Sequence, residues 1–459
     1  MTQPVAVPLW LLVLIIAFAM LSFASHFLFP SVRWFLRRRV ERAVARLNQR
    51  LQRPIDLFKL AERQDRIARL AYDPAVMQAV SDHAVATGMP LPVAFEDARR
   101  YAREIVPGFS TTLYFGVAIR LARWLSRLLY RVRFGRLDPI LRRIDPNATV
   151  IFVMNHRSNM DYVLVTWLVS GRATISYAVG EWARIWPLKS LIRSMGAYFI
   201  RRNSRSPLYR RVLARYVQMA TQEGITQAIF LEGGLSLTGA AGIARLGLLS
   251  YIVAGHDPVG RDVVFVPVGL GYDRVLEDGI LLAAQASGTR AFRMRPLSVL
   301  AFAARTVGRM IIGRFHGFGT AAAAFGAPIS LRAYLGQNAG ATTEMLGQHL
   351  MQEILRVVPV VPVPLVAAAL LTRPAHQIAL MAEVGRLTDE LAQHGAILKL
   401  APQGQQATVS EALRVLRERG LVDADLGHTD AGRALLSFYA APVQQRLSGK
   451  IAGLAEPGA

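Results

Sequence analysis

The pattern of apolar and polar positions is clearest between residues 146 and 335. Short apolar runs of strand length alternate there with longer segments of helical spacing, which predicts an α/β sheet with helices against its faces. The predicted strands are 148–154, 175–179, 198–200, 227–231 and 263–268. The predicted helices are 160–170, 185–195, 206–223 and 241–254.

The pattern changes after residue 335. Residues 357–371 are apolar but contain three prolines, so they are a poor candidate for a membrane-spanning helix. We interpret 336–459 as a C-terminal helical region, of which 374–459 form a small helical appendage.

Helical spacing recurs in that region at 374–394 and 410–419. The second helix is predicted to open with a capping box, Thr408-Val409-Ser410-Glu411, and to end at Gly420. Residues 419–428 have the composition of a small hairpin. A helix followed by a hairpin suggests a winged helix.

The most hydrophobic stretch lies at the other end of the chain. Residues 5–28 contain no charged side chain and are long enough to span a bilayer as a helix. A cleaved signal peptide is the alternative, but the stretch has no basic segment before it and its apolar part is long. The arginines that follow, from Arg33 to Arg53, predict that the rest of the chain stays cytoplasmic.

Residues 31–145 form a basic and mostly helical region next to this anchor. Residues 31–143 contain 23 Lys and Arg against 10 Asp and Glu, and 32–72 look helical. Within 113–133, arginines recur every three or four residues along one helical face, with leucines and a tryptophan on another. This helix could lie in a membrane interface, or it could be an ordinary amphipathic helix on a soluble core.

Composition narrows the class of protein. The chain has 459 residues, 53% of them hydrophobic, with a mean hydropathy of +0.30 and a net charge of +23. These values fit a membrane-attached globular protein, and the basic excess fits an anionic membrane surface. The sequence has no recognisable nucleic-acid motif, so we expect no nucleic-acid partner. Without cysteine, thiol catalysis and cysteine-ligated zinc are excluded, and histidines such as His83, His316 and His376 show no metal-ligand spacing.

One strand, turn and helix carries candidate chemistry. The apolar strand ends at Met154, and the polar turn Asn155-His156-Arg157-Ser158-Asn159 leads into the helix from Met160. Five helical steps rotate by roughly 140°, so His156 and Asp161 can meet only if the histidine lies in the turn and the aspartate reaches back. A histidine oriented by a carboxylate is a general base.

Three further segments extend this signal. They are Gly196-Ala197-Tyr198-Phe199-Ile200-Arg201-Arg202, Phe230-Leu231-Glu232-Gly233-Gly234-Leu235-Ser236-Leu237-Thr238-Gly239 and Val264-Phe265-Val266-Pro267-Val268-Gly269-Leu270-Gly271-Tyr272. With the turn, their order and spacing resemble the four blocks of the glycerolipid acyltransferase superfamily, most closely its bacterial and mitochondrial glycerol-3-phosphate acyltransferase branch. The resemblance covers about residues 148–335, and 146–335 would be the acyltransferase domain.

The resemblance implies roles for individual residues. His156 would be the general base for the acceptor hydroxyl, and Asp161 would hold its imidazole. Arg201 and Arg202 would bind the acceptor phosphate, although salt bridges at a strand end are the alternative. Glu232 and Gly233 would belong to the acceptor site, with a helix cap or a buried ion pair as the alternative for Glu232.

Two further features complete the expected site. Pro267 marks the fourth block. Backbone N–H groups of the turn, or of Gly233 and Gly234, could stabilise the oxyanion.

The implied activity is acyl transfer from acyl-CoA or acyl carrier protein to a glycerolipid hydroxyl, in phospholipid biosynthesis. A thioester is already activated, so we expect no metal and no cofactor. The partners would be membrane phospholipids, the thioester donor and a glycerol-phosphate or lysolipid acceptor. The expected location is the cell inner membrane, with one membrane span and a cytoplasmic catalytic domain. The sequence does not determine the oligomeric state.

The third block departs from the family pattern. Leu235, Leu237 and Ala240 stand where that branch has basic residues. A charge-assisted contact to phosphate contributes roughly 1.5–3 kcal/mol, so the acceptor could instead be a lysophospholipid, such as lysophosphatidate, or another lipid alcohol. A non-catalytic lipid-binding protein is a further alternative, against which the presence of both His156 and Asp161 argues.

Overall fold

The computed structural model describes residues 8–16, 20, 63–110, 112–180, 192–193, 195–201, 204–288, 296–313 and 315–449. The chain divides into two compact units, Met1–Ile55 and Asp56–Ala459. Most of the expected membrane span at 5–28, most of the expected helix at 185–195 and all of 32–62 lie outside the described residues. Among the described residues, no helix is long and apolar enough to cross a membrane.

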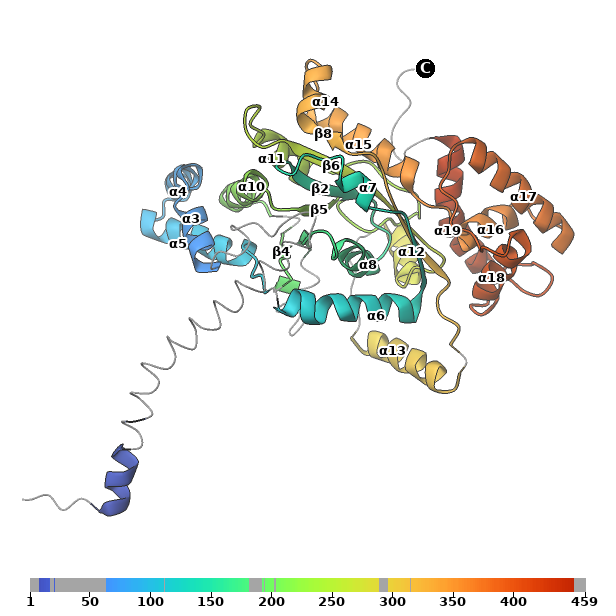
Figure 1. The fold of residues 1–459 in the computed structure, drawn as a ribbon, viewed down its shortest axis with the longest axis horizontal. Helices are drawn as coiled ribbons and strands as arrows, with labels where there is room; N and C mark the ends of the chain where they lie inside the picture. Colours follow the sequence, from blue (N-terminus) through green and yellow to red (C-terminus); the bar gives the residue numbers. More distant parts are fainter. Residues whose placement is uncertain are drawn as a thin grey trace, which may run out of the picture. The chain divides into compact units, whose positions relative to one another are not determined.

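A mixed β-sheet forms the centre of the second unit (Figure 1). The strand order is β1-β7-β6-β2-β5-β3-β4, with β8 also paired to β6. β2 pairs in parallel with β5 and β6, whereas β6 pairs antiparallel with β7 and β8. The strands are β1 (Arg131–Phe134), β2 (Thr149–Met154), β3 (Ser176–Val179), β4 (Tyr198–Phe199), β5 (Gln227–Phe230), β6 (Val263–Tyr272), β7 (Thr320–Phe325) and β8 (Ile329–Ser330).

The central strand β2 explains why helices cover both faces of the sheet. All six of its residues are buried. Val150 and Phe152 belong to one hydrophobic cluster, and Ile151 and Val153 to the other, as the two-residue period of a strand requires. A strand that is apolar on both faces must be covered on both faces.

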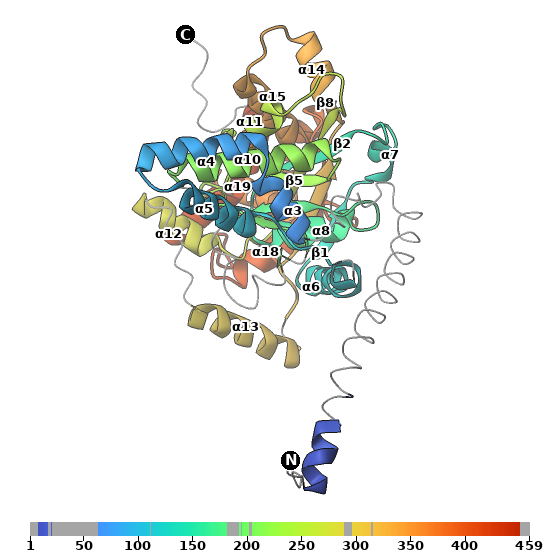
Figure 2. The same cartoon turned by 90° about the vertical axis from the view of Figure 1, so that its left-hand side faces the viewer.

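The helices accordingly form two layers (Figures 1 and 2). The cluster that contains Ile151 is completed by α3 (Arg63–Ala71), α4 (Pro74–Thr87), α5 (Leu91–Ile105), α10 (Pro207–Gln222), α11 (Gly247–Ala254), α14 (Leu331–Gln337) and α15 (Thr343–Val357). The cluster that contains Phe152 is completed by the π-helical segment η1 (Thr112–Ala118), α6 (Ile119–Leu129), α7 (Asp138–Leu141), α8 (Met160–Val169), α12 (Asp278–Ser287), α16 (Pro362–Leu370), α17 (Gln377–Gln393), α18 (Gln405–Arg417) and α19 (Asp430–Ser448). Helix α13 (Pro296–Ile311) lies beside this second layer.

The sequence pattern located five strands correctly and missed three. The strands expected at 148–154, 175–179, 198–200, 227–231 and 263–268 correspond to β2 to β6. The helix expected over 113–133 is wrong at its end, because α6 stops at Leu129 and Arg131–Phe134 is β1. Strand β7 has the sequence Thr-Ala-Ala-Ala-Ala-Phe, and alanine has little strand propensity.

Two expectations for the C-terminal region are also wrong. Helix α18 begins at Gln405, so Thr408 lies inside the helix, where its hydroxyl donates to the Gly404 carbonyl. The expected capping box therefore does not form. Residues 420–429 form turns and contain no strand, so the hairpin of a winged helix is absent from this described segment.

The C-terminal helices share the hydrophobic core of the sheet. Every residue of α16 is buried, and α19 contributes Phe438 and Tyr439 to the same cluster as β2. The Tyr439 hydroxyl donates to Asp278 of α12 and accepts from Arg419 Nη1 at 3.0 Å. Arg419 Nη2 also lies 2.6 Å from Asp278 Oδ2. Residues 336–449 are thus joined to the sheet by both apolar packing and a polar network.

Asp273, directly after β6, makes stability depend on pH. Its carboxylate is buried and accepts hydrogen bonds from the backbone N–H groups of Thr320 and Val363, yet burial raises its pKa from 3.8 to about 6. The folded state therefore binds this proton more tightly than the unfolded state. We expect a stabilisation of about 3 kcal/mol that is complete below pH 3.8 and lost as the pH rises through about 6.

Denaturant unfolding of the wild type and of Asp273→Asn at a series of pH values measures this effect. The difference between the two free energies of unfolding should change across that interval. An unchanged difference would show that Asp273 titrates normally.

Candidate active site

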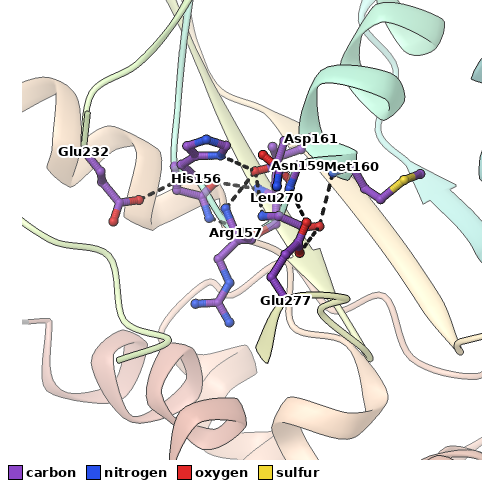
Figure 3. A network of polar contacts seen from close by, with 10 residues as sticks. His156, Arg157, Asn159, Met160, Asp161, Glu232, Leu270 and Glu277 are labelled. Carbon is purple, nitrogen blue, oxygen red and sulfur yellow. Dashed lines mark hydrogen bonds and ion pairs between the residues drawn. The ribbon is translucent and has the colours of Figure 1, made fainter. Parts of the chain in front are cut away.

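The turn after β2 brings His156 and Asp161 together. Helix α8 begins at Met160, which leaves His156 in the turn and Asp161 in the first helical turn, as the spacing predicted. His156 Nδ1 lies 2.9 Å from Asp161 Oδ2 (Figure 3). The side chains are only 2% and 0% exposed. In a pair of side chains this deeply buried, the carboxylate favours the tautomer with a proton on Nδ1, which leaves Nε2 as the basic nitrogen.

The Asp161 carboxylate also organises the backbone of the turn. Its Oδ2 accepts hydrogen bonds from the N–H groups of Arg157 at 2.7 Å and Ser158 at 3.1 Å. Tyr272 is its neighbour from β6: burial, and then the Asp161 charge, raise the pKa of this tyrosine well above its ordinary value. One carboxylate therefore orients the imidazole and holds the turn that presents it.

Glu232 ties the third block to the same turn. Its Oε1 accepts a hydrogen bond from the His156 N–H at 2.9 Å, and its Oε2 accepts one from the Gly242 N–H at 3.1 Å. Burial raises the pKa of Glu232, while these two donors and Arg157 oppose the rise. Glu232 is thus a backbone clamp between β2 and the loop after β5. It is neither a helix cap nor a partner in a direct ion pair among the described residues.

Two residues that sequence reasoning missed complete the support of the turn. The Asn155 amide accepts from the Leu270 N–H at 2.8 Å and donates to the Leu270 carbonyl at 3.0 Å. Glu277 accepts from the Ser158 hydroxyl at 2.8 Å and from the Asn159 N–H at 3.1 Å. Asn155 belongs to the motif and could have been singled out. Glu277 is 118 residues from its partner Asn159, so no local signal identifies it.

Arg157 points away from the imidazole, toward the C-terminal helices (Figure 3). It is 4% exposed, and its guanidinium carbon lies 5.3 Å from the centre of the Phe438 ring. Burial lowers its pKa, and the charges of Glu232 and Asp161 oppose this. The residue beside the histidine therefore connects the turn to α19.

An apolar pocket of about 250 Å³ adjoins the histidine. Tyr162 forms part of its wall, and the Tyr162 ring meets the His156 ring edge-to-face at 5.6 Å. Asn159 also lines the pocket, whereas Phe230 stacks on the imidazole at 4.0 Å. The remaining lining residues are Tyr114, Ala118, Leu121, Ala122, Leu125, Val163, Thr166, Tyr177, Val179, Ile192, Met195 and Ala197. Such a lining suits a hydrocarbon chain.

Arg201, one of the two arginines expected to bind the acceptor phosphate, lies in a salt bridge, which was the alternative for this residue. Arg201 donates from Nε and Nη2 to the two carboxylate oxygens of Glu104, at 2.9 and 2.6 Å, and this pairing raises its pKa. Arg202 lies outside the described residues. Leu235 and Leu237 pack against the hydrophobic core. Pro267 lies inside β6, opposite Val153 of β2.

The turn does not offer the oxyanion donors that the sequence suggested. The N–H groups of residues 156 to 159 are all donated to Glu232, Asp161 or Glu277. The Gly233 N–H donates to the Phe230 carbonyl at 2.9 Å. Within the part of the chain that the structure describes, the Gly234 N–H has no acceptor. Among the same residues, no group of three or more His, Asp or Glu could hold a metal ion.

Comparison with known proteins identifies two matching family models and several curated relatives. Residues 132–271 match the family model described as acyltransferase, and residues 311–444 match the one described as glycerol-3-phosphate acyltransferase C-terminal region. The glycerol-3-phosphate acyltransferase of Pseudomonas putida KT2440 is 28% identical over 413 residues, which are 83% of this chain and 48% of that protein. Its counterpart from Aeromonas hydrophila is 29% identical over 300 residues, which are 63% of this chain and 35% of that protein.

The chain thus spans about half the length, or less, of the curated relatives it matches. A crystal structure of the 1-acyl-sn-glycerophosphate acyltransferase from Thermotoga maritima is 15% identical, with a TM-score of 0.32, and covers 64% of this chain and 95% of that one.

The histidine and aspartate at the end of the central strand lie within the acyltransferase match, and most of the helical C-terminal region lies within the second match. The chain is therefore similar to the glycerolipid acyltransferase superfamily and, within it, to the glycerol-3-phosphate acyltransferase branch.

Proposed function

We propose that this chain transfers a fatty acyl group from acyl-CoA or acyl carrier protein to the hydroxyl of glycerol 3-phosphate, in phospholipid biosynthesis. The observation that carries the proposal is the buried His156–Asp161 pair beside an apolar pocket. The names of the curated relatives support glycerol 3-phosphate as the acceptor.

In the proposed mechanism His156 Nε2 takes the proton of the acceptor hydroxyl as its oxygen attacks the thioester carbonyl carbon. Asp161 stabilises the imidazolium through the Nδ1 proton. The tetrahedral intermediate collapses as the carbon–sulfur bond breaks, and the imidazolium returns its proton to the departing thiolate. The N–H of Gly234, which has no acceptor among the described residues, would be a backbone donor for the oxyanion.

The apolar pocket would hold the acyl chain. Its wall includes Tyr162, which contacts the histidine ring, so a chain bound there would have its carboxyl end near the base. Burial of each methylene contributes about 0.8 kcal/mol, which would favour long-chain donors.

The acceptor phosphate would need a cation that is free to bind it. Arg201 could contribute only by exchanging Glu104 for the phosphate, and Arg202 is its neighbour in sequence. The core-facing Leu235 and Leu237 favour a second candidate, acylation of a lysophospholipid, because they leave the third block without a cation.

An acceptor panel tests the proposal and separates the two candidates. The full chain would be given acyl-CoA or acyl carrier protein with glycerol 3-phosphate, lysophosphatidate or a neutral monoacylglycerol, and products would be identified by lipid mass spectrometry. We expect lysophosphatidate as the product formed from glycerol 3-phosphate. Turnover of lysophosphatidate alone would favour the second candidate, and no turnover of any acceptor would contradict both.

We further propose attachment to the cytoplasmic face of the inner membrane, through one span at residues 5–28. The surface of α6 supports a membrane contact. Leu121 and Trp124 are 46% and 59% exposed, and Arg120 and Arg123 are exposed beside them. Leu121 also lines the apolar pocket, so a lipid surface at α6 would lie next to the pocket that takes the acyl chain.

A further inference from the structure

A second pocket, of about 180 Å³, is lined by three arginines. Arg274 follows β6, and Arg305 and Arg309 lie one turn apart on α13. Thr306, Phe315 and Phe318 complete the lining, which includes no acidic side chain. None of these residues belongs to the four sequence blocks or to the turn of His156.

The three arginines of this pocket differ in their surroundings. Arg305 and Arg309 are exposed and form no ion pair within the described residues. The Arg274 guanidinium lies 4.4 Å from the centre of the Phe318 ring, and burial, followed by the charge of Arg419, lowers its pKa. An anion bound between the three arginines would remove this repulsion and would accept hydrogen bonds from each guanidinium.

The surrounding sequence is complementary to a negative surface. Residues 281–343 contain seven arginines and no aspartate or glutamate. One carboxylate from elsewhere in the chain reaches this stretch, since Glu418 Oε1 lies 3.7 Å from His316 Nδ1. The charge of the stretch itself is strongly positive, so electrostatic attraction would bring a partner with many negative charges toward it over a distance limited by salt screening.

The outer face of α13 is apolar. Val307 and Ile311 are 52% and 79% exposed and lie one turn apart, about half a turn around the helix from Arg305 and Arg309. Ile312 is 62% exposed at the end of the helix. Isoleucines this exposed on one side of a helix, with arginines on the other, characterise helices that lie in a membrane interface.

We propose that α13 is a docking element for anionic phospholipids. Val307, Ile311 and Ile312 enter the acyl region of the bilayer, and the pocket of Arg274, Arg305 and Arg309 binds the phosphate of a lipid headgroup. Helix α6, with its exposed Leu121 and Trp124, lies on the same side of the second unit as α13 in both Figure 1 and Figure 2. This site is distinct from acyl transfer, so its test does not depend on the proposed function.

The test uses the full chain in neutral detergent micelles. Short-chain phosphatidylglycerol and phosphatidylcholine of equal chain length are titrated in, and hydrogen–deuterium exchange is followed over residues 304–318. We expect phosphatidylglycerol to protect α13 more strongly than phosphatidylcholine. Arg305→Gln/Arg309→Gln should weaken the apparent affinity for phosphatidylglycerol about 30-fold, since each arginine at an anionic lipid surface contributes roughly fivefold.

Controls separate this site from general basicity and from free phosphate. Arg99→Gln/Arg103→Gln on α5 removes the same charge at the same spacing and should leave the titration unchanged. Equal protection by the two lipids would overturn the anion site. Stronger protection by inorganic phosphate or coenzyme A than by phosphatidylglycerol would assign the pocket to a soluble phosphate compound and overturn the lipid proposal. No protection by any of these compounds would also overturn it.

Discussion

Replacing His156 with alanine is expected to lower the turnover number by 10²- to 10⁴-fold, the usual contribution of a general base. The variant removes an imidazole that has a buried carboxylate at Nδ1 and that contacts Tyr162 of the pocket wall. The affinity for the acyl donor should change little, because Tyr162 and the rest of the pocket wall remain. Steady-state transfer from acyl-CoA, with separate values of kcat and KM, measures both.

Two companion variants define how this result is interpreted. Asp161→Asn should lose at least about 10²-fold, because the amide no longer stabilises the imidazolium. His83→Ala, on α4, should keep wild-type activity and the same melting temperature. Near wild-type transfer by the His156 variant would refute the base assignment. Lipid binding without turnover by the wild type would instead indicate a non-catalytic lipid-binding protein.

Gly239→Ala is expected to destabilise the protein by about 2–5 kcal/mol, from left-handed backbone strain and steric overlap together. Gly239 has φ +85°, and a Cβ atom there would lie 1.9 Å from the backbone oxygen of Phe438. The Cβ atom is fixed to the backbone of residue 239, and the oxygen belongs to the backbone of Phe438. Neither atom can therefore move aside unless the third-block loop or α19 shifts. Chemical denaturation measures the loss of stability.

Gly279→Ala is the matched control. Gly279 lies in α12, has no positive φ, and a Cβ atom there would meet nothing within 4 Å. This variant should be neutral or slightly more stable, since alanine lowers the entropy of the unfolded chain. If Gly239→Ala were equally neutral, the close approach between the loop and α19 would not exist in solution.

The contact at Gly239 is one of several that tie α19 to the site. Gln445 makes two hydrogen bonds with the backbone of Ala241, at 2.7 and 2.8 Å, and Phe438 packs under the Arg157 guanidinium. The helix therefore fixes both the third-block loop and the turn of His156. This explains in physical terms why an acyltransferase sheet is followed by a dedicated helical region.

Fold prediction succeeded where the local pattern was strong. Strands β2 and β6 are continuous apolar runs, and burial on both faces demands such runs. Strand β1, with the sequence Arg-Val-Arg-Phe, continued the arginine spacing of α6 and was mistaken for helix. Its strand conformation comes from pairing with β7, almost 190 residues later.

The site shows the same division between local and distant information. The His156–Asp161 pair could be predicted because five residues of turn and helix determine its geometry. The partner of Arg201 could not, because Glu104 is 97 residues away on α5. Nor could the sequence show that Glu232 and Glu277 accept hydrogen bonds from N–H groups of the turn, since both carboxylates come from loops that follow other strands.

The sequence by itself thus determined the strand, the turn and the histidine with its carboxylate, because these depend on residues that are neighbours in the chain. Only the tertiary structure decided which donors remain for the oxyanion, which arginines are free, and that the C-terminal helices hold the turn. Those properties depend on which distant groups satisfy each other's hydrogen bonds and charges, and packing sets that choice. The strand-end histidine is local, but the environment that would make it a catalyst is assembled from the whole of the second unit.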